Sequence, residues 1–264
     1  MFLDIASILS DDEISRLEEL LERIPEEVNC RSRKNLLVYY IRSAIESNEV
    51  QPIIIYGMKG AGKSTLALKS VAYYFMKHNN MECGEAYFEA LNRLIHTPKE
   101  FFTAIEKYND ILIWDDAGVW LSTYFWYLPE MRPYLVYFFN WYDTSRTDVN
   151  VLVFTTPHIK KLPPVLREDV GVLRVRVKHV GNKVLPDGRR IKKALAHIVK
   201  YDISDYTLKP YTEELGNMGY DVYLPDLVFE AYSIIRDGYH RLAKKLLKKV
   251  LIEKKMLKEE IAQE

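Results

Sequence analysis

The residues from Gly57 to Thr65 have the types and the spacing that hold a nucleotide's phosphates. They read Gly-Met-Lys-Gly-Ala-Gly-Lys-Ser-Thr and fit the pattern G-x-x-x-x-G-K-[ST]. A loop of this kind points successive backbone N–H groups at a phosphate, and its glycines take turns that a Cβ would hinder. The Lys63 ammonium then reaches the β- and γ-phosphates, and the Ser64 hydroxyl ligates Mg²⁺. The residues that we expect to bind ATP are Gly57, Gly60, Ala61, Gly62, Lys63, Ser64 and Thr65.

The residues on either side of this loop favour a phosphate site over a chance glycine-rich turn. Residues 51–56 form an apolar run that is rich in strand-forming residues, and residues 66–75 form an apolar helical run. The order strand, loop, helix places a helix N-terminus at the phosphate, where its partial positive charge favours an anion. We therefore expect a nucleoside triphosphate, ATP with Mg²⁺, as the cofactor.

A second apolar run, residues 110–114, ends in the two carboxylates Asp115 and Asp116. Hydrolysis of Mg·ATP needs one acid to hold the metal and a second group to orient the attacking water. We expect Asp115 to bind the metal together with Ser64, and Asp116 to orient the water. The alternative is that the acidic pair caps a helix that begins at Ala117.

A third apolar run, residues 150–154, ends in Thr155 and Thr156, and ligand groups in parallel sheets gather at such strand ends. Over residues 51–177 the three motifs resemble the additional-strand ATPases, which include the AAA+ proteins and the FtsK–HerA-type DNA motors. The resemblance implies an α/β fold, a P-loop NTPase three-layer sandwich with a mostly parallel sheet. It also implies a polar sensor at the third strand, either Thr155 or Thr156, and Thr156 is preferred because it is closer to the strand end. The second acid of AAA+ proteins is usually glutamate, so Asp116 departs from that pattern.

Two arginines gain candidate roles from the same resemblance. Arg167 follows the third strand, as does the AAA+ arginine finger that reaches a neighbouring subunit's γ-phosphate and so requires a homo-oligomer. The alternative is a surface arginine paired with Glu168 or Asp169. Arg241 follows Gly238 by three residues, as in the AAA+ sensor 2 segment, and would touch the nucleotide. The alternative there is an exposed arginine on a basic helix face.

Residues 172–184 and 191–203 predict a β-hairpin with a turn at residues 185–189, and this hairpin is strongly basic. Its cationic residues are Arg174, Arg176, Lys178, Lys183, Arg189, Arg190, Lys192 and Lys193. Such a surface suits the phosphate backbone of DNA, although Lys and Arg also guard sheet edges against pairing. We expect the turn to lie away from the phosphate loop.

The rest of the chain divides around this core. We expect N-terminal helices in residues 1–50, the ATPase core with the hairpin in residues 51–203, and a helical C-terminal lid or extension in residues 204–264. The helical tail itself is expected from Asp226 to Glu264. The second N-terminal helix is expected over about residues 32–47. Gly84–Phe88 is a candidate strand. The aromatic residues between Val119 and Tyr142 are expected in the core, with base stacking as the alternative.

Composition limits the remaining function classes. The formal net charge is zero, and no apolar run is long enough to span a bilayer, so we expect a cytoplasmic protein without a membrane partner. Cys30 and Cys83 lie far apart in the chain, and we expect neither a disulfide nor a zinc site. The leading hypothesis is a DNA-directed ATPase, similar in size and composition to those of archaeal viruses and plasmids. The alternative is a regulatory switch or protein-remodelling ATPase that does not bind DNA.

Overall fold

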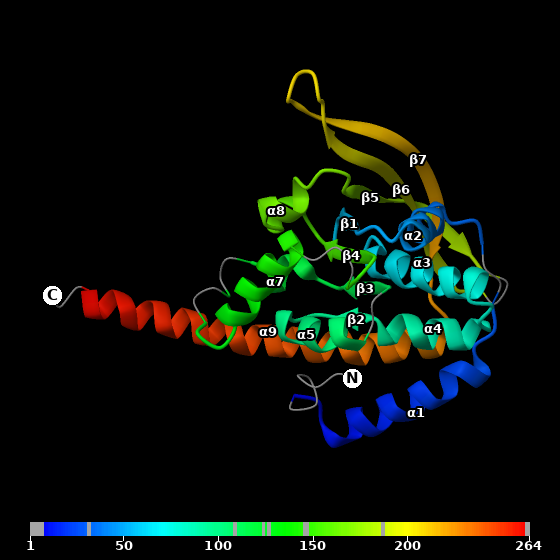
Figure 1. Cartoon of the computed structure of the whole chain (residues 1–264). Helices are drawn as coiled ribbons and strands as arrows, with labels where there is room; N and C mark the ends of the chain where they lie inside the picture. The colour runs from blue at the N-terminus through cyan, green and yellow to red at the C-terminus, as the bar shows by residue number, and fades with distance from the viewer. Residues whose placement is uncertain are drawn as a thin grey trace.

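The computed structural model describes residues 8–30, 33–107, 110–122, 125, 128–144, 148–185 and 188–261, with side chains as far as Ile252. Figure 1 shows the arrangement of its helices and strands. The helices are α1 (Asp11–Glu27), α2 (Leu36–Ser47), α3 (Lys63–His78), α4 (Cys83–Asn92), α5 (Pro98–Lys107), α6 (Ala117–Trp120), α7 (Arg132–Thr144), α8 (Pro164–Arg167) and α9 (Asp226–Ile261), with a 3-10 turn η2 (Ile159–Lys161). The strands are β1 (Gln51–Gly57), β2 (Leu94–Ile95), β3 (Ile111–Trp114), β4 (Val151–Thr156), β5 (Leu173–Val184), β6 (Arg190–Ile203) and β7 (Pro210–Val222).

A seven-stranded mixed sheet runs through the molecule in the order β2-β3-β4-β1-β5-β6-β7. The first five strands in this order are parallel, whereas β6 and β7 are antiparallel to their neighbours. The expected α/β fold with a mostly parallel sheet is confirmed. Because β4 lies between β1 and β3, the glycine-rich loop, the acidic pair and the two threonines all follow strands that end at one edge of the sheet.

Helices cover the sheet and bury an extensive apolar core. Helices α2 and α3 pack against β1 and β4, α4 packs on α3, and α1 packs on α4. Helices α5 and α7 bring aromatic rings against Trp114 of β3, whose ring lies 5.7 Å from that of Phe101 and 4.8 Å from that of Phe138. Trp120, Phe125, Phe138 and Trp141 are buried, so the expectation that this aromatic segment forms core is confirmed for them. Tyr124 and Trp126 lie outside the described residues.

The candidate strand at Gly84–Phe88 is wrong, because these residues belong to α4. Glu82 and Glu85 form a capping box that starts this helix. Gly84 lies where α4 crosses the end of α1, and a Cβ at this position would stand 2.3 Å from the carbonyl oxygen of Ile24. A small residue was therefore needed for close helix packing, and the strand that precedes β3 in the chain is Leu94–Ile95 instead.

The expectation that neither cysteine is in a disulfide is also wrong. Cys30 and Cys83 form a disulfide, with their Cα atoms 5.6 Å apart, although the residues are 53 positions apart in the chain. The packing of α1 on α4 brings the two residues together, and the bond ties the end of the N-terminal helical segment to the start of α4. Spacing along the sequence gave no sign of this approach.

Two expected boundaries change. Helix α2 begins at Leu36, after Asn35, whose side chain accepts a hydrogen bond from the Leu37 N–H, and the expected start at Ser32 lies outside the described residues. The helix expected from Asp226 is confirmed as α9, but the extension that begins at residue 204 is not helical throughout, because residues 210–222 form β7 and pair with β6. The basic hairpin is confirmed as β5 and β6, and β6 and β7 form a second hairpin that projects at the top of Figure 1.

Candidate functional site

The glycine-rich loop joins β1 to α3 and needs its glycines for steric reasons. Gly57 and Gly62 have φ angles of 150° and 91°, which L side chains rarely adopt. A Cβ on Gly57 would stand 2.3 Å from the Val177 carbonyl oxygen of β5. A Cβ on Gly62 would stand 2.6 Å from the Val222 side chain of β7. The loop is thus held close to β5 and β7. The Tyr220 hydroxyl of β7 donates a hydrogen bond to the Gly62 carbonyl at 2.9 Å.

The N-terminus of α3 is open at this loop. Gly62 is the N-cap residue and has no side chain to satisfy the first N–H groups, which have no partner within the helix. Such N–H groups and the positive end of the helix dipole form an anion site. Lys63 is largely buried, and its Nζ donates to the Met58 carbonyl at 3.1 Å. Burial lowers the pKa of Lys63, while the charges of Asp116 and Asp115 oppose this shift.

Asp115 is fully buried at the centre of a hydrogen-bond network. Its Oδ1 accepts from the Ser64 hydroxyl at 2.7 Å and from the Thr155 hydroxyl at 2.6 Å. Its Oδ2 accepts from the Tyr232 hydroxyl of α9 at 2.8 Å. Burial raises the pKa of Asp115, and the negative charge of Asp116 adds to this, although the three hydrogen bonds favour the ionised form. The two predicted metal ligands are thus brought into direct contact.

Asp116 follows with a left-handed backbone, at φ 49°. It precedes α6, but its side chain makes no capping hydrogen bond, so the helix-cap alternative is wrong for this carboxylate. Its Oδ2 instead lies 3.0 Å from Nε2 of His240 on α9. Burial would raise the pKa of Asp116, but this hydrogen bond and the nearby charges of His240 and Lys63 lower it.

Thr155, not Thr156, is the hydroxyl at the acids. Thr155 donates to Asp115 and accepts from the Asp116 backbone N–H at 3.0 Å. Thr156 donates to the His158 carbonyl at 3.1 Å and packs against Gly118, where a Cβ would stand 2.3 Å from its hydroxyl oxygen. The preference for Thr156 is corrected because successive side chains of a strand point to opposite faces, and only Thr155 faces the acids.

Sequence reasoning missed the aromatic and histidine side chains that enclose the acids. His96, directly after β2, is buried, with its Nε2 3.9 Å from Asp115 Oδ2 and its ring stacked 3.9 Å from that of Tyr239. Burial lowers the pKa of His96 to about 3, so the ring is neutral near pH 7. Tyr232, Tyr239 and His240 recur at seven- and eight-residue spacing on α9, which places them on one helix face. That spacing was the signal available in the sequence.

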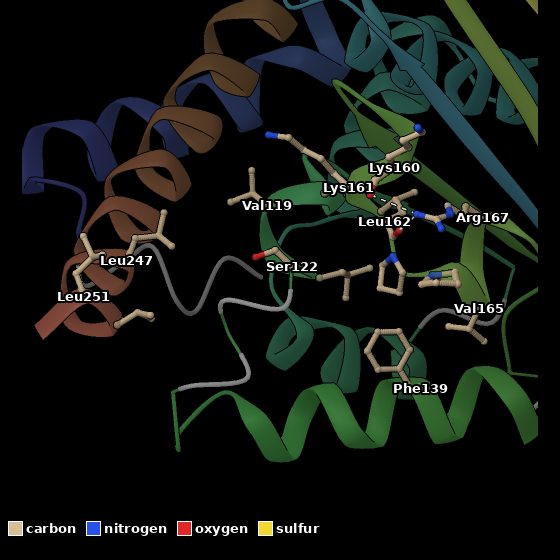
Figure 2. Close-up of a pocket in the computed structure, with 15 residues that line it drawn as sticks. Val119, Ser122, Phe139, Lys160, Lys161, Leu162, Val165, Arg167, Leu247 and Leu251 are labelled. Carbon is tan, nitrogen blue, oxygen red and sulfur yellow. Dashed lines mark hydrogen bonds between the residues drawn. The ribbon is translucent and has the colours of Figure 1, made fainter. Parts of the chain in front are cut away.

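The two arginines with candidate roles are each paired with a carboxylate outside the loop. Arg167 pairs with Glu168 at 2.9 Å, and its Nη1 lies 3.4 Å from the Lys160 carbonyl. Figure 2 shows Arg167 and Lys160 in this part of the structure. The surface-pair alternative is therefore confirmed within this chain, and a role toward another subunit stays a prediction. Arg241 makes two contacts with the Glu13 carboxylate of α1, at 2.8 and 2.9 Å. It does not reach the acids, which His240 contacts instead.

Some cations of the basic hairpin contact other residues of the chain, and others are exposed to solvent. β5 runs parallel to β1 and extends past the end of β1 at this edge of the sheet, so the hairpin approaches the glycine-rich loop, while the expected distance of its turn from the loop stays a prediction. There, Nζ of Lys192 lies 3.4 Å from the Gly60 carbonyl, and Arg189 pairs with Asp226 at 2.9 Å. Arg176 and Lys178 are exposed, since they alternate along β5 with the buried Val175 and Val177.

Within the described residues, no group of three or more His, Cys, Asp or Glu side chains is arranged to hold a metal ion by itself. None of the described helices is both long enough and apolar enough to cross a membrane. A site of one hydroxyl and one carboxylate suits Mg²⁺, which usually takes one or two protein ligands together with waters and a substrate phosphate.

Comparison with known proteins relates the chain to a protein of a virus. No protein-family model matches it. It is similar to "Uncharacterized protein B-251" of Sulfolobus spindle-shape virus 1, with 32% identity over 221 residues. The match covers 80% of this chain and 83% of the viral protein, so it spans most of both. The chain therefore belongs to the same family as protein B-251 of Sulfolobus spindle-shape virus 1.

Proposed function

We propose that this protein is a Mg²⁺-dependent ATPase with a phosphate loop at Gly57–Thr65. The hydrogen bond of 2.7 Å between Ser64 and Asp115 carries the proposal, because it joins residues 51 positions apart that two independent motifs assign to one metal. A chance glycine turn and a chance acidic pair would not be expected to meet at the edge of one sheet.

The residues of the site fit a Mg·ATP complex. The open N–H groups of α3 and the Lys63 ammonium would bind the phosphates, and Ser64 and Asp115 would hold the metal. Asp116, ionised at neutral pH because its pKa is lowered, would orient the attacking water. Bound Mg²⁺ supplies charge neutralisation at the phosphates. Thr155 and Tyr232 fix the Asp115 carboxylate, and Thr155 also holds the Asp116 backbone.

The topology supports the resemblance to the additional-strand ATPases. In the sheet, β4 is inserted between the loop strand β1 and the acidic strand β3, and it carries a hydroxyl between the two sites. We place the protein in this class, near the AAA+ and FtsK–HerA-type ATPases. Its departures are the aspartate at position 116 and the α9 residues that stand where a sensor 2 arginine was expected.

We further propose that hydrolysis serves work on DNA, such as initiation, loading, translocation or packaging. The observation that favours DNA is the pair Arg176 and Lys178, which is exposed on β5 and has no ion-pair partner among the described residues. Phosphate neutralisation by such cations supplies most nonspecific affinity. A nucleotide-dependent switch or remodelling ATPase without DNA is the alternative, and DNA-independent turnover would favour it.

ATP hydrolysis by purified protein, with Mg²⁺ or with a chelator, tests the proposal. Lys63→Ala should lower the rate at least about 100-fold, the usual loss when a charge-stabilising donor is removed. Lys59→Ala, in the same loop but outside the pattern, is the matched control and should retain activity. Hydrolysis by Lys63→Ala at the wild-type rate would show that this loop is not the active site.

A further inference from the structure

The molecule has an apolar groove that no part of the proposed reaction uses. A cavity of about 890 Å³ lies between α6, the segment from η2 to α8, and the C-terminal half of α9. Its walls include Leu121, Leu162 and Leu247, and Leu251 is 68% exposed at its margin. Figure 2 shows the α9 leucines on one side of the cavity and Phe139 with the loop residues on the other.

The rim of this groove is cationic. Lys160, Lys161 and Arg167 line it, and no acidic residue is among the described lining residues. The two lysines are exposed and have no ion-pair partner within the described part of the chain. An apolar cavity with a positive rim selects an apolar knob flanked by carboxylates.

The chain itself carries such a knob at the tip of the β6–β7 hairpin, which projects beyond the body of the protein (Figure 1). Tyr206 is 99% exposed and Leu208 is 79% exposed. Residues 202–214 contain four acidic and one basic side chains. The acidic Asp205 lies beside Tyr206, is exposed, and has no ion-pair partner among the described residues.

The tip is also held in a fixed and costly shape. The Ser204 N–H donates to the Lys209 carbonyl at 3.0 Å, and the Leu208 N–H donates to the Ser204 carbonyl at 2.9 Å. Leu208 has a φ angle of 53°, which is unfavourable for a residue with a Cβ. Within one chain, the strained Leu208 side chain is exposed to water and is not buried by any neighbour. Burial of this side chain in a partner would offset the energetic cost of the strained backbone.

We propose that two copies of this chain associate head to tail, with the Tyr206–Leu208 tip of one copy inserted into the apolar groove of the other. Asp205 then lies near Lys160 and Lys161 of the receiving copy. The two surfaces differ, so the contact is heterologous, and each copy keeps a free tip or a free groove for another copy. The inference does not depend on the proposed ATPase activity.

Sedimentation velocity over a series of protein concentrations, without nucleotide, tests this proposal. Wild-type protein should form species larger than a monomer. The tip variant Tyr206→Ser/Leu208→Ser and the groove variant Leu251→Asp should each be monomeric by themselves. Mixed together they should form a dimer and nothing larger, because one retains an intact groove and the other an intact tip. Monomeric wild type, or two variants that fail to pair on mixing, would overturn the proposal.

A charge exchange tests the same contact through exposed side chains. Asp205→Lys should weaken association at least about tenfold, because it places like charges against Lys161. Adding Lys161→Glu in the same chain as Asp205→Lys should restore association. The double variant Lys209→Glu/Lys161→Glu, which keeps Asp205, should associate weakly. If the tip variants associate like wild type and only Leu251→Asp is monomeric, another segment fills the groove and the proposal is wrong.

Discussion

His240 on the C-terminal helix α9 lies with its Nε2 3.0 Å from Oδ2 of Asp116, although 124 positions separate the two residues. Through this contact, α9 covers the edge of the sheet that carries the acids. The sequence motifs had predicted that α9 reaches the nucleotide through Arg241. Because the imidazole favours the ionised carboxylate, His240 helps keep Asp116 able to accept a proton or a hydrogen bond from water. In the proposed ATPase, His240 is thus a positioning residue.

Replacing His240 should therefore move the pH dependence of ATP hydrolysis. In His240→Ala the pKa of Asp116 should rise, because the substitution removes a hydrogen bond and a positive charge that lower it. The base works only above its pKa, so the acidic limb of the kcat profile should move to higher pH. The measurement is kcat between pH 4 and 8. Arg241→Ala, which breaks only the contact with Glu13, is the control and should leave this limb in place.

Asp116→Asn should allow ATP to bind but reduce kcat at least about 100-fold at every pH, because it removes the group that orients the water. Binding is measured with a fluorescent ATP analogue, and turnover by phosphate release. Normal turnover by this variant would assign the water-orienting role to another residue.

Asp115→Asn should raise the stability of the fold toward neutral pH while it lowers ATP hydrolysis. Burial raises the pKa of Asp115, so ionising it above the ordinary aspartate pKa of about 4 costs folding free energy. The asparagine has no such cost and can still accept from Ser64 and Thr155. Relative to wild type, the variant should gain stability as pH rises from 4 toward 7, at about 1.4 kcal/mol for each unit by which the pKa is raised. Urea unfolding measures this, and Mg²⁺-dependent hydrolysis should fall in the same variant.

The loop and the acids could be predicted from sequence because each depends on local rules. Gly62, Lys63 and Ser64 lie in one short motif, and Asp115 follows a short, strongly apolar run that favours a buried strand. Their meeting follows from the way parallel strands end at one edge of a sheet. The choice of Thr155 over Thr156 required the strand's orientation, which depends on the faces that α3 and α7 cover.

Long-range packing could not be predicted in this way. Tyr232 and His240 reach the acids because α9 crosses this edge of the sheet, and nothing within α9 specifies its direction. Gly84 reads as part of a strand until the α1 crossing is known, and the approach of Cys30 to Cys83 depends on that same crossing. β7 was missed because residues 210–222 mix polar, glycine and aromatic residues without clear alternation.

Reduction of the Cys30–Cys83 disulfide should lower the free energy of unfolding by about 4 kcal/mol, the chain-entropy value for a closed loop of this length. The physical cause is the freedom that the unfolded chain regains when the 53-residue connection opens. Urea unfolding with and without reductant measures the difference. The double variant Cys30→Ser/Cys83→Ser should show the reduced stability in both conditions. A wild type that is equally stable in both conditions would contradict the disulfide.

The proposed binding of DNA depends on the exposed cations of β5. Arg176→Glu/Lys178→Glu should weaken DNA binding with little dependence on sequence, because interactions with phosphates carry no base information. The slope of log affinity against log salt should fall by about one unit for each phosphate that the variant no longer neutralises. Basal ATP hydrolysis should persist, since neither side chain is among those that contact the loop or the acids. Lys244→Glu/Lys245→Glu on α9 carries the same change in net charge and is the matched control. Filter binding over a salt series gives both slopes.

Wild-type protein that binds no DNA at about 50 mM salt, where nonspecific complexes are strong, would favour the switch or remodelling function over work on DNA.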